Sequence, residues 1–432
     1  MDLEIAPGAA PRSQRLGGLD LSPYRSLQMG QWVKLICGAS YQDMPTVQRL
    51  VMLYALAGVD CIDVAADGAV VAAARRGVAD AVRLAGYGEH RSLGLPWLMV
   101  SLNDSEDPHF RKAHFDAAHC PPDCDRPCEP ICPTAAIQFQ APGQGGVTTE
   151  LCYGCGRCIA VCPVSAIEAQ SYLVSPEAFP VDQLNQIDAV EIHTQTGHQA
   201  QFTQLWQRLE PWRPYLKLVS ISCPDHDHVV PYLKDLYRIM APLGVPLIWQ
   251  TDGRPMSGDL GRGTTHAAIR LAQKILEAGL PGYVQPAGGT NGYTVSKLLE
   301  LGLINQAASG APLREILPNG LPTTQWVGAA AKTSALGAKT ISGIAYGSYG
   351  RSQVLPLLDA IDQELQPWLG AESSNQRTIG QRTPLSTDLP TNAASTPWPP
   401  LHQSALDQGL TLARQLVGQL KSDCHFLSKR YG

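Results

Sequence analysis

The sequence predicts an α/β fold: a (β/α)8-barrel-like parallel domain, interrupted by a small α+β domain and followed by a terminal helix. Three observations support this prediction. Eight short apolar runs alternate with segments of helical periodicity. A cysteine-rich block, residues 104–172, separates the third run from the fourth. A polar stretch and a short amphipathic segment close the 432-residue chain.

The predicted strands are short runs rich in β-branched and aromatic residues, bounded by glycine, proline or asparagine. They read WVKLICGAS, CIDVAA, PWLMVSLN, AVEIHT, LKLVSIS, PLIWQTDG, YVQPAGG and ISGIAYGS. Helices with apolar residues at helical spacing are expected between them. Their ranges are 46–58, 68–86, 199–208, 229–243, 264–278 and 293–301. Eight such units favour a closed barrel, and a doubly wound open sheet is the alternative.

The barrel is expected in two parts, residues 31–103 and 173–369, after an N-terminal extension over residues 1–30. Because the block at 104–172 directly follows a strand, it should sit over the C-terminal face of the barrel, where barrel enzymes keep their active sites. We expect strands PWLMVSLN and AVEIHT, which flank the block, to be neighbours.

The end of the chain changes composition. Residues 370–400 are rich in Ser, Thr, Asn, Gln and Pro, which predicts a flexible linker. Residues 401–432 contain an amphipathic helix, which either docks on the body of the chain or binds a partner helix. Its apolar stripe consists of Leu406, Leu410, Ala413, Val417 and Leu420.

Charge and hydropathy exclude some functions. The net charge is −5, and lysine and arginine are scattered, so no nucleic-acid partner is expected. No apolar run reaches the roughly 18 residues that a membrane-spanning helix needs, and the N-terminus lacks the apolar core of a signal peptide. We therefore expect a cytoplasmic protein without a membrane span.

Eight of the twelve cysteines form two runs. The second, Cys152-x2-Cys155-x2-Cys158-x3-Cys162-Pro, has the spacing of bacterial ferredoxins, whose thiolates hold iron–sulfur clusters. The first has three-residue gaps throughout and departs from that pattern. It consists of Cys120, Cys124, Cys128 and Cys132, followed by proline. CPTAAI in the first run is echoed by CPVSAI thirty residues later, which indicates an internal duplication.

The similarity to two-cluster ferredoxins implies that the fourth cysteine of each run binds the other cluster. One cluster would then use Cys120, Cys124, Cys128 and Cys162. The other would use Cys132, Cys152, Cys155 and Cys158. Both are expected to be [4Fe–4S], and the wider gaps of the first set predict a more exposed cluster that can convert to [3Fe–4S]. A pair of zinc sites and purely structural clusters are the alternatives.

The two cysteine runs, together with PAGGTNGYT and ISGIAYGSYGR, resemble the light-dependent-period family of cyanobacteria. This resemblance covers most of the chain outside the linker. It implies an iron–sulfur redox sensor that feeds the light-dependent redox state of the cell into the circadian clock, in association with clock-input or redox partner proteins. It favours a sensor or electron carrier over a catalyst.

Glycine-rich loops follow the last two predicted strands, where barrels often bind phosphate. They contain Gly288, Gly289 and Thr290 after the seventh strand and Gly347 and Ser348 after the eighth. A flavin or another phosphorylated ligand would suit such loops, and ordinary glycine turns that leave the strands are an equal alternative.

Other polar and thiol side chains lie on or after predicted strands and are expected to face one pocket. They are Lys34, Cys37, His193, Thr194, Cys223, Asp252 and Arg254. Cys61 is expected in the core and Cys424 on the surface. These residues leave a second function open: an oxidoreductase in which the clusters pass electrons to a flavin or substrate at the barrel mouth.

Overall fold

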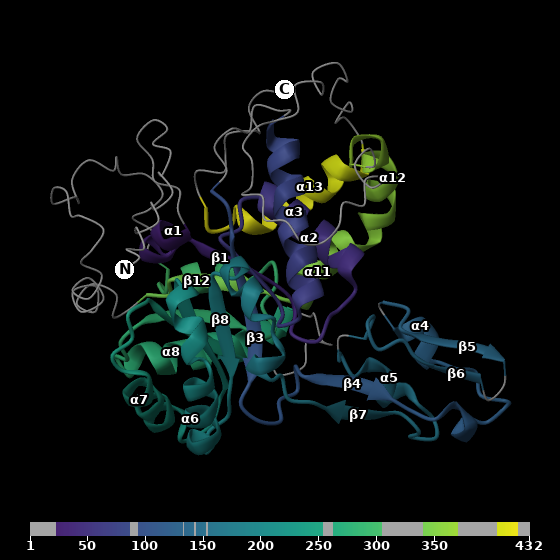
Figure 1. Ribbon diagram of the computed structural model, residues 1–432, viewed down its shortest axis with the longest axis horizontal. Coiled ribbons are helices and arrows are strands. Elements are labelled where there is room, and N and C mark those ends of the chain that lie inside the picture. The colour runs from purple at the N-terminus through teal and green to yellow at the C-terminus, as the bar shows by residue number, and fades with distance from the viewer. Residues whose placement is uncertain are drawn as a thin grey trace, which may run out of the picture.

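Eight parallel strands form the centre of the computed structural model (Figure 1). The structure describes residues 23–86, 94–132, 134–141, 144–152, 154–253, 262–304, 340–369 and 404–421. The strands are β1 (Trp32–Gly38), β2 (Cys61–Ala65), β3 (Trp97–Asn103), β8 (Ala189–His193), β9 (Leu218–Pro224), β10 (Leu247–Asp252), β11 (Tyr283–Ala287) and β12 (Gly343–Tyr346). Each coincides with one of the eight predicted runs.

The strands follow one another around a nearly closed barrel. From β1 to β11, each strand pairs in parallel with the next barrel strand in chain order, and β12 pairs with β1, starting with Trp32 opposite Gly343. Between β11 and β12 the Ser342 N–H donates to the Val284 carbonyl at 2.9 Å. The barrel prediction is therefore confirmed, and the open-sheet alternative is wrong.

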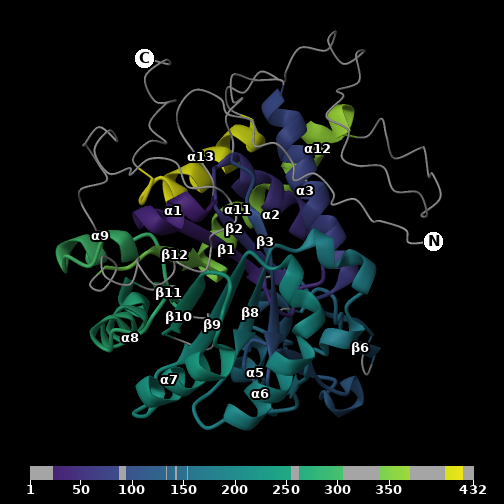
Figure 2. The same ribbon diagram turned by 60° about the vertical axis from the view of Figure 1, so that its left-hand side comes forward.

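The helices lie outside the barrel (Figure 2), except that the first places Leu27 in the apolar cluster inside it. They are α1 (Pro23–Met29), α2 (Met44–Leu56), α3 (Gly68–Gly86), α6 (Gln199–Arg208), α7 (Val229–Met240), α8 (Thr265–Glu277), α9 (Thr294–Glu300), α11 (Ser348–Val354), α12 (Leu358–Leu369) and α13 (Ala405–Val417). The strand residues that point outward pack with these helices in the main apolar core, as Val33 and Leu35 do. The alternate residues, such as Trp32, point into the barrel.

Helices α2 and α3 pack closely where Gly77 lies on α3. A Cβ atom there would lie 2.4 Å from the Gln48 carbonyl oxygen and 2.8 Å from the Val51 Cβ. We expect Gly77→Ala to push the helices apart and to lower the free energy of unfolding by about 1–3 kcal/mol, despite the better helix propensity of alanine. Urea unfolding followed by circular dichroism measures this. Gly244→Ala, whose Cβ would meet no atom within 4 Å, is the matched control; an equal effect of both changes would contradict the prediction.

The cysteine-rich segment projects from one end of the barrel (Figure 1). It contains β4 (Arg111–His114), α4 (Cys128–Ile131), β5 (Ile137–Ala141), β6 (Gln144–Val147), α5 (Arg157–Val161) and β7 (Glu168–Ser171). Strands β4 and β7 pair antiparallel, as do β5 and β6. Its flanking barrel strands β3 and β8 pair directly, as predicted.

One asparagine holds the two ends of this segment together. The Asn103 side chain, at the end of β3, donates to the Tyr172 carbonyl at 2.9 Å and accepts from the Val174 N–H at 2.9 Å. The Tyr172 N–H also donates to the Phe110 carbonyl at 3.0 Å. The chain therefore leaves the barrel and returns to it at one place.

The terminal helix α13 packs on the body of the chain. Leu406, Leu410, Ala413 and Val417 are buried in the main core, and Leu420 packs against it. A Cβ atom at Gly409 would lie 3.1 Å from Ile361 of α12 and 3.6 Å from Leu53 of α2. Docking on the chain's own body is thus the arrangement observed. The predicted linker and Cys424 lie outside the described residues, and no described helix is long and apolar enough to cross a membrane.

Candidate functional site

One group of four cysteines lines a cavity in the projecting segment. Cys132, from the first run, lies there with Cys152, Cys155 and Cys158 from the second. Burial, together with the nearby Cys155, Cys152 and Cys132, raises the pKa of the Cys158 thiol to about 12. Four thiols that disfavour one another's ionisation in this way are suited to share a metal centre, which relieves the repulsion.

The other four cysteines form a second group. Burial raises the pKa of Cys128, and Cys162, Cys120 and Cys124 then raise it further. The pKa of Cys120 is raised by burial and then by Cys124, with a smaller contribution from Cys162. The fourth cysteine of each run therefore lies with the first three of the other run, which is the grouping that the ferredoxin similarity implies.

The two halves repeat the same local geometry. The Ala136 N–H donates to Cys132 Sγ at 3.2 Å, and thirty residues later the Ala166 N–H donates to Cys162 Sγ at 3.2 Å. The residues just before these donors, Ala135 and Ser165, are both left-handed, with φ of 50° and 53°. This shared turn supports the duplication inferred from CPTAAI and CPVSAI.

Glycine is required in the second run because the chain passes close to β4. Gly154 has a φ of +72°, and a Cβ atom there would lie 2.2 Å from the Arg111 carbonyl oxygen. Near this contact the Ala113 N–H, in β4, donates to Cys152 Sγ at 3.3 Å. Strand β4 thus supports the second run directly, and it is also the strand by which the segment leaves the barrel.

Burial differs between the two groups. Cys152 and Cys158 are buried in one group, whereas only Cys128 is buried in the other. Both groups have backbone N–H donors. In the group around Cys120, Cys124 accepts from the Arg126 N–H at 3.4 Å and Cys162 accepts from the Ala166 N–H at 3.2 Å. The group around Cys120 is therefore more exposed, although it has backbone donors of its own.

The glycine-rich loops are close to each other but engaged internally. Thr290 Oγ1 donates to the Ala345 carbonyl at 2.5 Å, and Ser348 Oγ accepts from Arg351 at 3.1 Å. A Cβ atom at Gly289 would lie 2.7 Å from the Thr264 carbonyl oxygen, so packing accounts for this glycine. Gly288 has a φ of 61°. Gly347 precedes α11, and a Cβ atom there would meet no atom within 4 Å.

The structure separates the other predicted pocket residues. Lys34, His193 and Asp252 lie at inward positions of the barrel. Cys37 and Cys223 pack instead in the outer apolar core, because they are one residue out of phase with the inward positions. The expectation that these two thiols face the pocket is therefore wrong.

Three other residues singled out in the sequence are Thr194, Cys61 and Arg254. Thr194 contacts Asp104 and Tyr232 rather than the pocket. Cys61 is buried inside the barrel, in agreement with the prediction that it is a core residue. Arg254 lies outside the described residues.

A buried polar network fills the middle of the barrel. Lys34 Nζ pairs with Glu191 and lies 3.4 Å from Asp63 Oδ2, and all three side chains are buried. Burial alone would lower the pKa of Lys34, but the two carboxylates raise it above its ordinary value. Burial, opposed by the charge of Lys34, raises the pKa of Asp63 to about 6. The network is ionic.

Sequence reasoning missed four functional candidates: Asp63, Asp107, His109 and Glu191. Each of the runs WVKLICG, CIDVAA and AVEIHT carries one charged residue amid apolar ones, and this signal identifies an ionic barrel interior. Asp107 and His109 lie in the segment before β4 that contacts the barrel mouth, and their D-x-H spacing is too common to single them out.

The chain is similar to known proteins in both its parts. A family model described as "LdpA Fe-S cluster-binding domain" matches residues 120–173, and one described as "Light dependent period A C-terminal domain" matches residues 182–419. A curated protein named "Light dependent period A", from Synechococcus elongatus, is 54% identical over 283 residues. The match covers 65% of this chain and 77% of the relative.

Proposed function

Because the chain belongs to the light dependent period A family, we propose that it is an iron–sulfur redox sensor that couples the light-dependent redox state of the cell to the circadian clock. Clock-input or redox partner proteins would read the change. The observation that carries this proposal is the sorting of eight thiols into two groups of four, each drawn from both runs. The proposal places the protein in the cytoplasm, where free thiols persist.

The donor set fits iron–sulfur clusters. Thiolates are the ligands that these clusters use, and backbone N–H groups directed at sulfur stabilise them. Bound clusters supply one-electron chemistry. In the proposal, one [4Fe–4S] cluster is held by Cys132, Cys152, Cys155 and Cys158. The other, which can convert to [3Fe–4S], is held by Cys120, Cys124, Cys128 and Cys162.

We expect Cys155→Ser and Cys124→Ser to damage different clusters, because each removes one thiolate from a different group. Anaerobic purification with iron and sulfide quantitation, followed by paramagnetic resonance, measures this. Each variant should lose about half of the iron and one of two signals. If both variants lose the same signal and keep the other, the crossed ligand assignment is wrong. Cys223→Ser, in the outer core, is the matched control.

Redox sensing requires that partner contacts depend on oxidation state. Holoprotein immobilised without oxygen, in dithionite-reduced and ferricyanide-oxidised forms, is exposed to a cyanobacterial extract. A sensor should capture at least one protein several-fold more in one state. The Cys124→Ser/Cys155→Ser double variant should lose this difference. Equal capture in both states would contradict the sensing role while leaving the cluster assignment intact.

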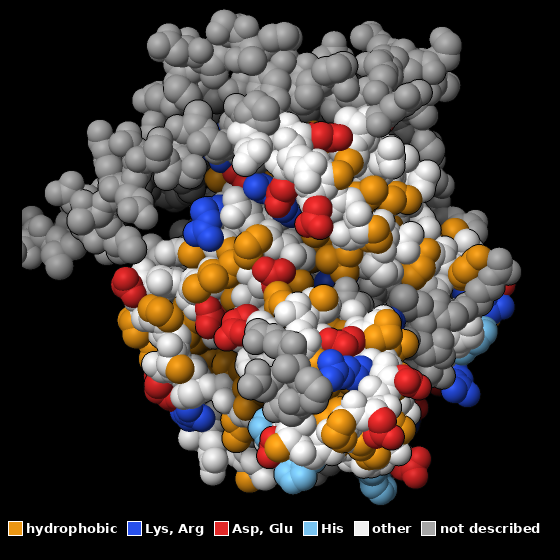
Figure 3. All heavy atoms as spheres, turned by 90° about the vertical axis from the view of Figure 1, so that its right-hand side faces the viewer, with side chains coloured by type: hydrophobic (Ala, Val, Ile, Leu, Met, Phe, Trp, Pro, Cys, Tyr) orange, Lys and Arg blue, Asp and Glu red, His pale blue; other side chains and the backbone are white. Residues whose placement is uncertain are grey.

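An oxidoreductase is the second candidate, favoured by the position of the cysteine-rich segment directly after β3, next to the barrel mouth. It would need a bound electron acceptor, and the loops at Gly288–Thr290 and Gly347–Ser348 are the proposed phosphate site. A stoichiometric flavin band in the anaerobic spectrum would favour this candidate over the sensor. The face that carries the projecting segment mixes acidic, basic and apolar side chains without a basic stripe (Figure 3), so nucleic acid is not among the partners proposed.

A further inference from the structure

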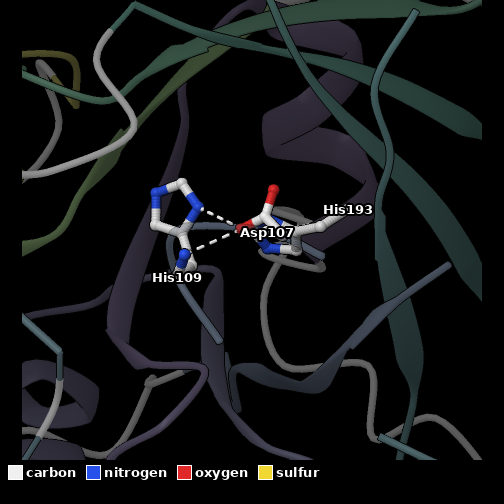
Figure 4. Close-up of side chains that lie close together, drawn as sticks. All are labelled: Asp107, His109 and His193. Atoms are coloured by element: carbon white, nitrogen blue, oxygen red, sulfur yellow. Dashed lines mark hydrogen bonds and ion pairs between the residues drawn. The ribbon is translucent and has the colours of Figure 1, made fainter. Parts of the chain in front are cut away.

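A third group of side chains that can bind a metal lies at the barrel mouth, outside both cysteine groups. Asp107 and His109 precede β4, and His193 ends β8. One oxygen or nitrogen atom from each of the three lies within 4.8 Å of the others. Figure 4 shows the Asp107 carboxylate beside both imidazoles. We propose that these three residues bind one divalent transition-metal ion such as zinc.

The spacing of the donor atoms suits such an ion. Asp107 Oδ1 lies 2.8 Å from His109 Nδ1 and 3.6 Å from His193 Nδ1. Ligand atoms about 2.0–2.2 Å from zinc lie roughly 3–3.5 Å from one another. The two Asp107 distances therefore need shifts of only a few tenths of an ångström, and the ligand atoms of the two imidazoles lie within 4.8 Å of each other. Two imidazoles and one carboxylate leave a coordination position open for water.

Each imidazole has a carboxylate behind it. His193 Nε2 lies 3.2 Å from Glu191 Oε1, and His109 Nε2 lies 3.4 Å from Asp252 Oδ2. Histidine ligands commonly donate their second ring N–H to a carboxylate, which orients the ring and leaves the first nitrogen for the metal. Here both carboxylates would take the Nε2 protons, so that both Nδ1 lone pairs face Asp107.

The charge of the surroundings also calls for a cation. The barrel and its mouth bury four carboxylates, those of Asp63, Asp107, Glu191 and Asp252, and one ammonium group, that of Lys34, which pairs with Glu191 and Asp63. Asp252 Oδ1 is buried and has no hydrogen-bond partner among the residues that the structure describes. A buried carboxylate oxygen without a partner is costly. A divalent ion beside His109 would offset this excess of negative charge.

The His109 side chain is 30% exposed, so an ion can reach the site from solvent on that side. The His193 side chain is only 6% exposed. His109 also connects the site to the cysteine-rich segment, since it lies two residues before β4. The metal would therefore bridge the barrel strand β8 and the start of the projecting segment.

The test uses anaerobic full-length protein with its clusters intact, equilibrated with zinc and then freed of unbound metal. We expect one zinc per chain by mass spectrometry, with only nitrogen and oxygen neighbours in X-ray absorption. His109→Ala and His193→Ala should abolish this uptake. Asp252→Asn should weaken zinc binding about 10- to 100-fold, as removal of an orienting carboxylate does elsewhere.

His198→Ala is the matched control, because His198 lies near the same mouth but pairs with Asp104 and Ser105. It should bind zinc like the unmodified protein. Iron content and circular dichroism check that every variant is folded. Sulfur neighbours around zinc would show binding to the cysteines instead and overturn the proposal. Absence of zinc uptake, or equal uptake by folded His109→Ala, would overturn it as well.

Discussion

Replacing Lys34 by methionine is expected to lower the free energy of unfolding by about 3–5 kcal/mol. Methionine has nearly the same length, so the change removes the charge and creates little cavity. Glu191 and Asp63 would then be left buried without their cation. Leaving a buried charge uncompensated is among the most destabilising single changes, because the carboxylate cannot regain its hydration.

Urea unfolding followed by circular dichroism, under anaerobic conditions, measures the effect. Lys297→Met is the control, since Lys297 pairs with Glu300 at 2.8 Å on the surface of α9, and exposed pairs contribute about 0–1 kcal/mol. A second variant, Lys34→Met with Glu191→Gln, removes one of the stranded charges and should recover part of the loss. A Lys34→Met loss no larger than that of Lys297→Met would show that the network is not ionic.

The second large effect concerns oxidation. In air, we expect the cluster proposed for Cys120, Cys124, Cys128 and Cys162 to lose iron several-fold faster than the other. Only Cys128 of that group is buried, so oxygen and water reach its ligands more readily. If the protein senses redox state, the faster cluster is the natural switch and the slower one the electron relay.

Single-cluster variants separate the two rates. Cys155→Ser retains the more exposed group, and Cys124→Ser retains the cavity group. Both are exposed to air for timed intervals, and the remaining paramagnetic signal is followed, with samples under argon as the control. Faster decay in Cys124→Ser would reverse the proposed roles.

The barrel and the thiol grouping could be predicted from sequence because each has a local signal. Strands such as CIDVAA show β-branched runs between glycine and polar residues, and the spacing of Cys152, Cys155, Cys158 and Cys162 alone predicts cluster ligands. The side of a strand on which a residue lies is harder to predict when both faces are buried. Cys37 and Cys223 were therefore assigned to the pocket, although they face the helices.

Asp107 and His109 could not be predicted as neighbours of His193, which was a predicted pocket residue, because the three meet only after folding. Asp107 follows β3 at the start of the inserted segment, and His193 ends β8, the next barrel strand. The cysteine-rich segment separates the two residues in sequence. Their contact depends on the path of residues 104–110, which leaves no periodic pattern. Nonlocal polar clusters of this kind have no signature in a single sequence.

The hydrogen bonds of Asn103 bear on how the cysteine-rich segment could be gained, lost or exchanged. Because the Asn103 side chain, at the end of β3, hydrogen-bonds to Tyr172 and Val174 of the returning chain, the cysteine-rich segment leaves and re-enters the barrel at one narrow junction. Gain or loss of the segment would leave the pairing of β3 with β8 unchanged. At this junction the cysteine-rich segment could be exchanged for another segment while the register of β3 and β8 is kept.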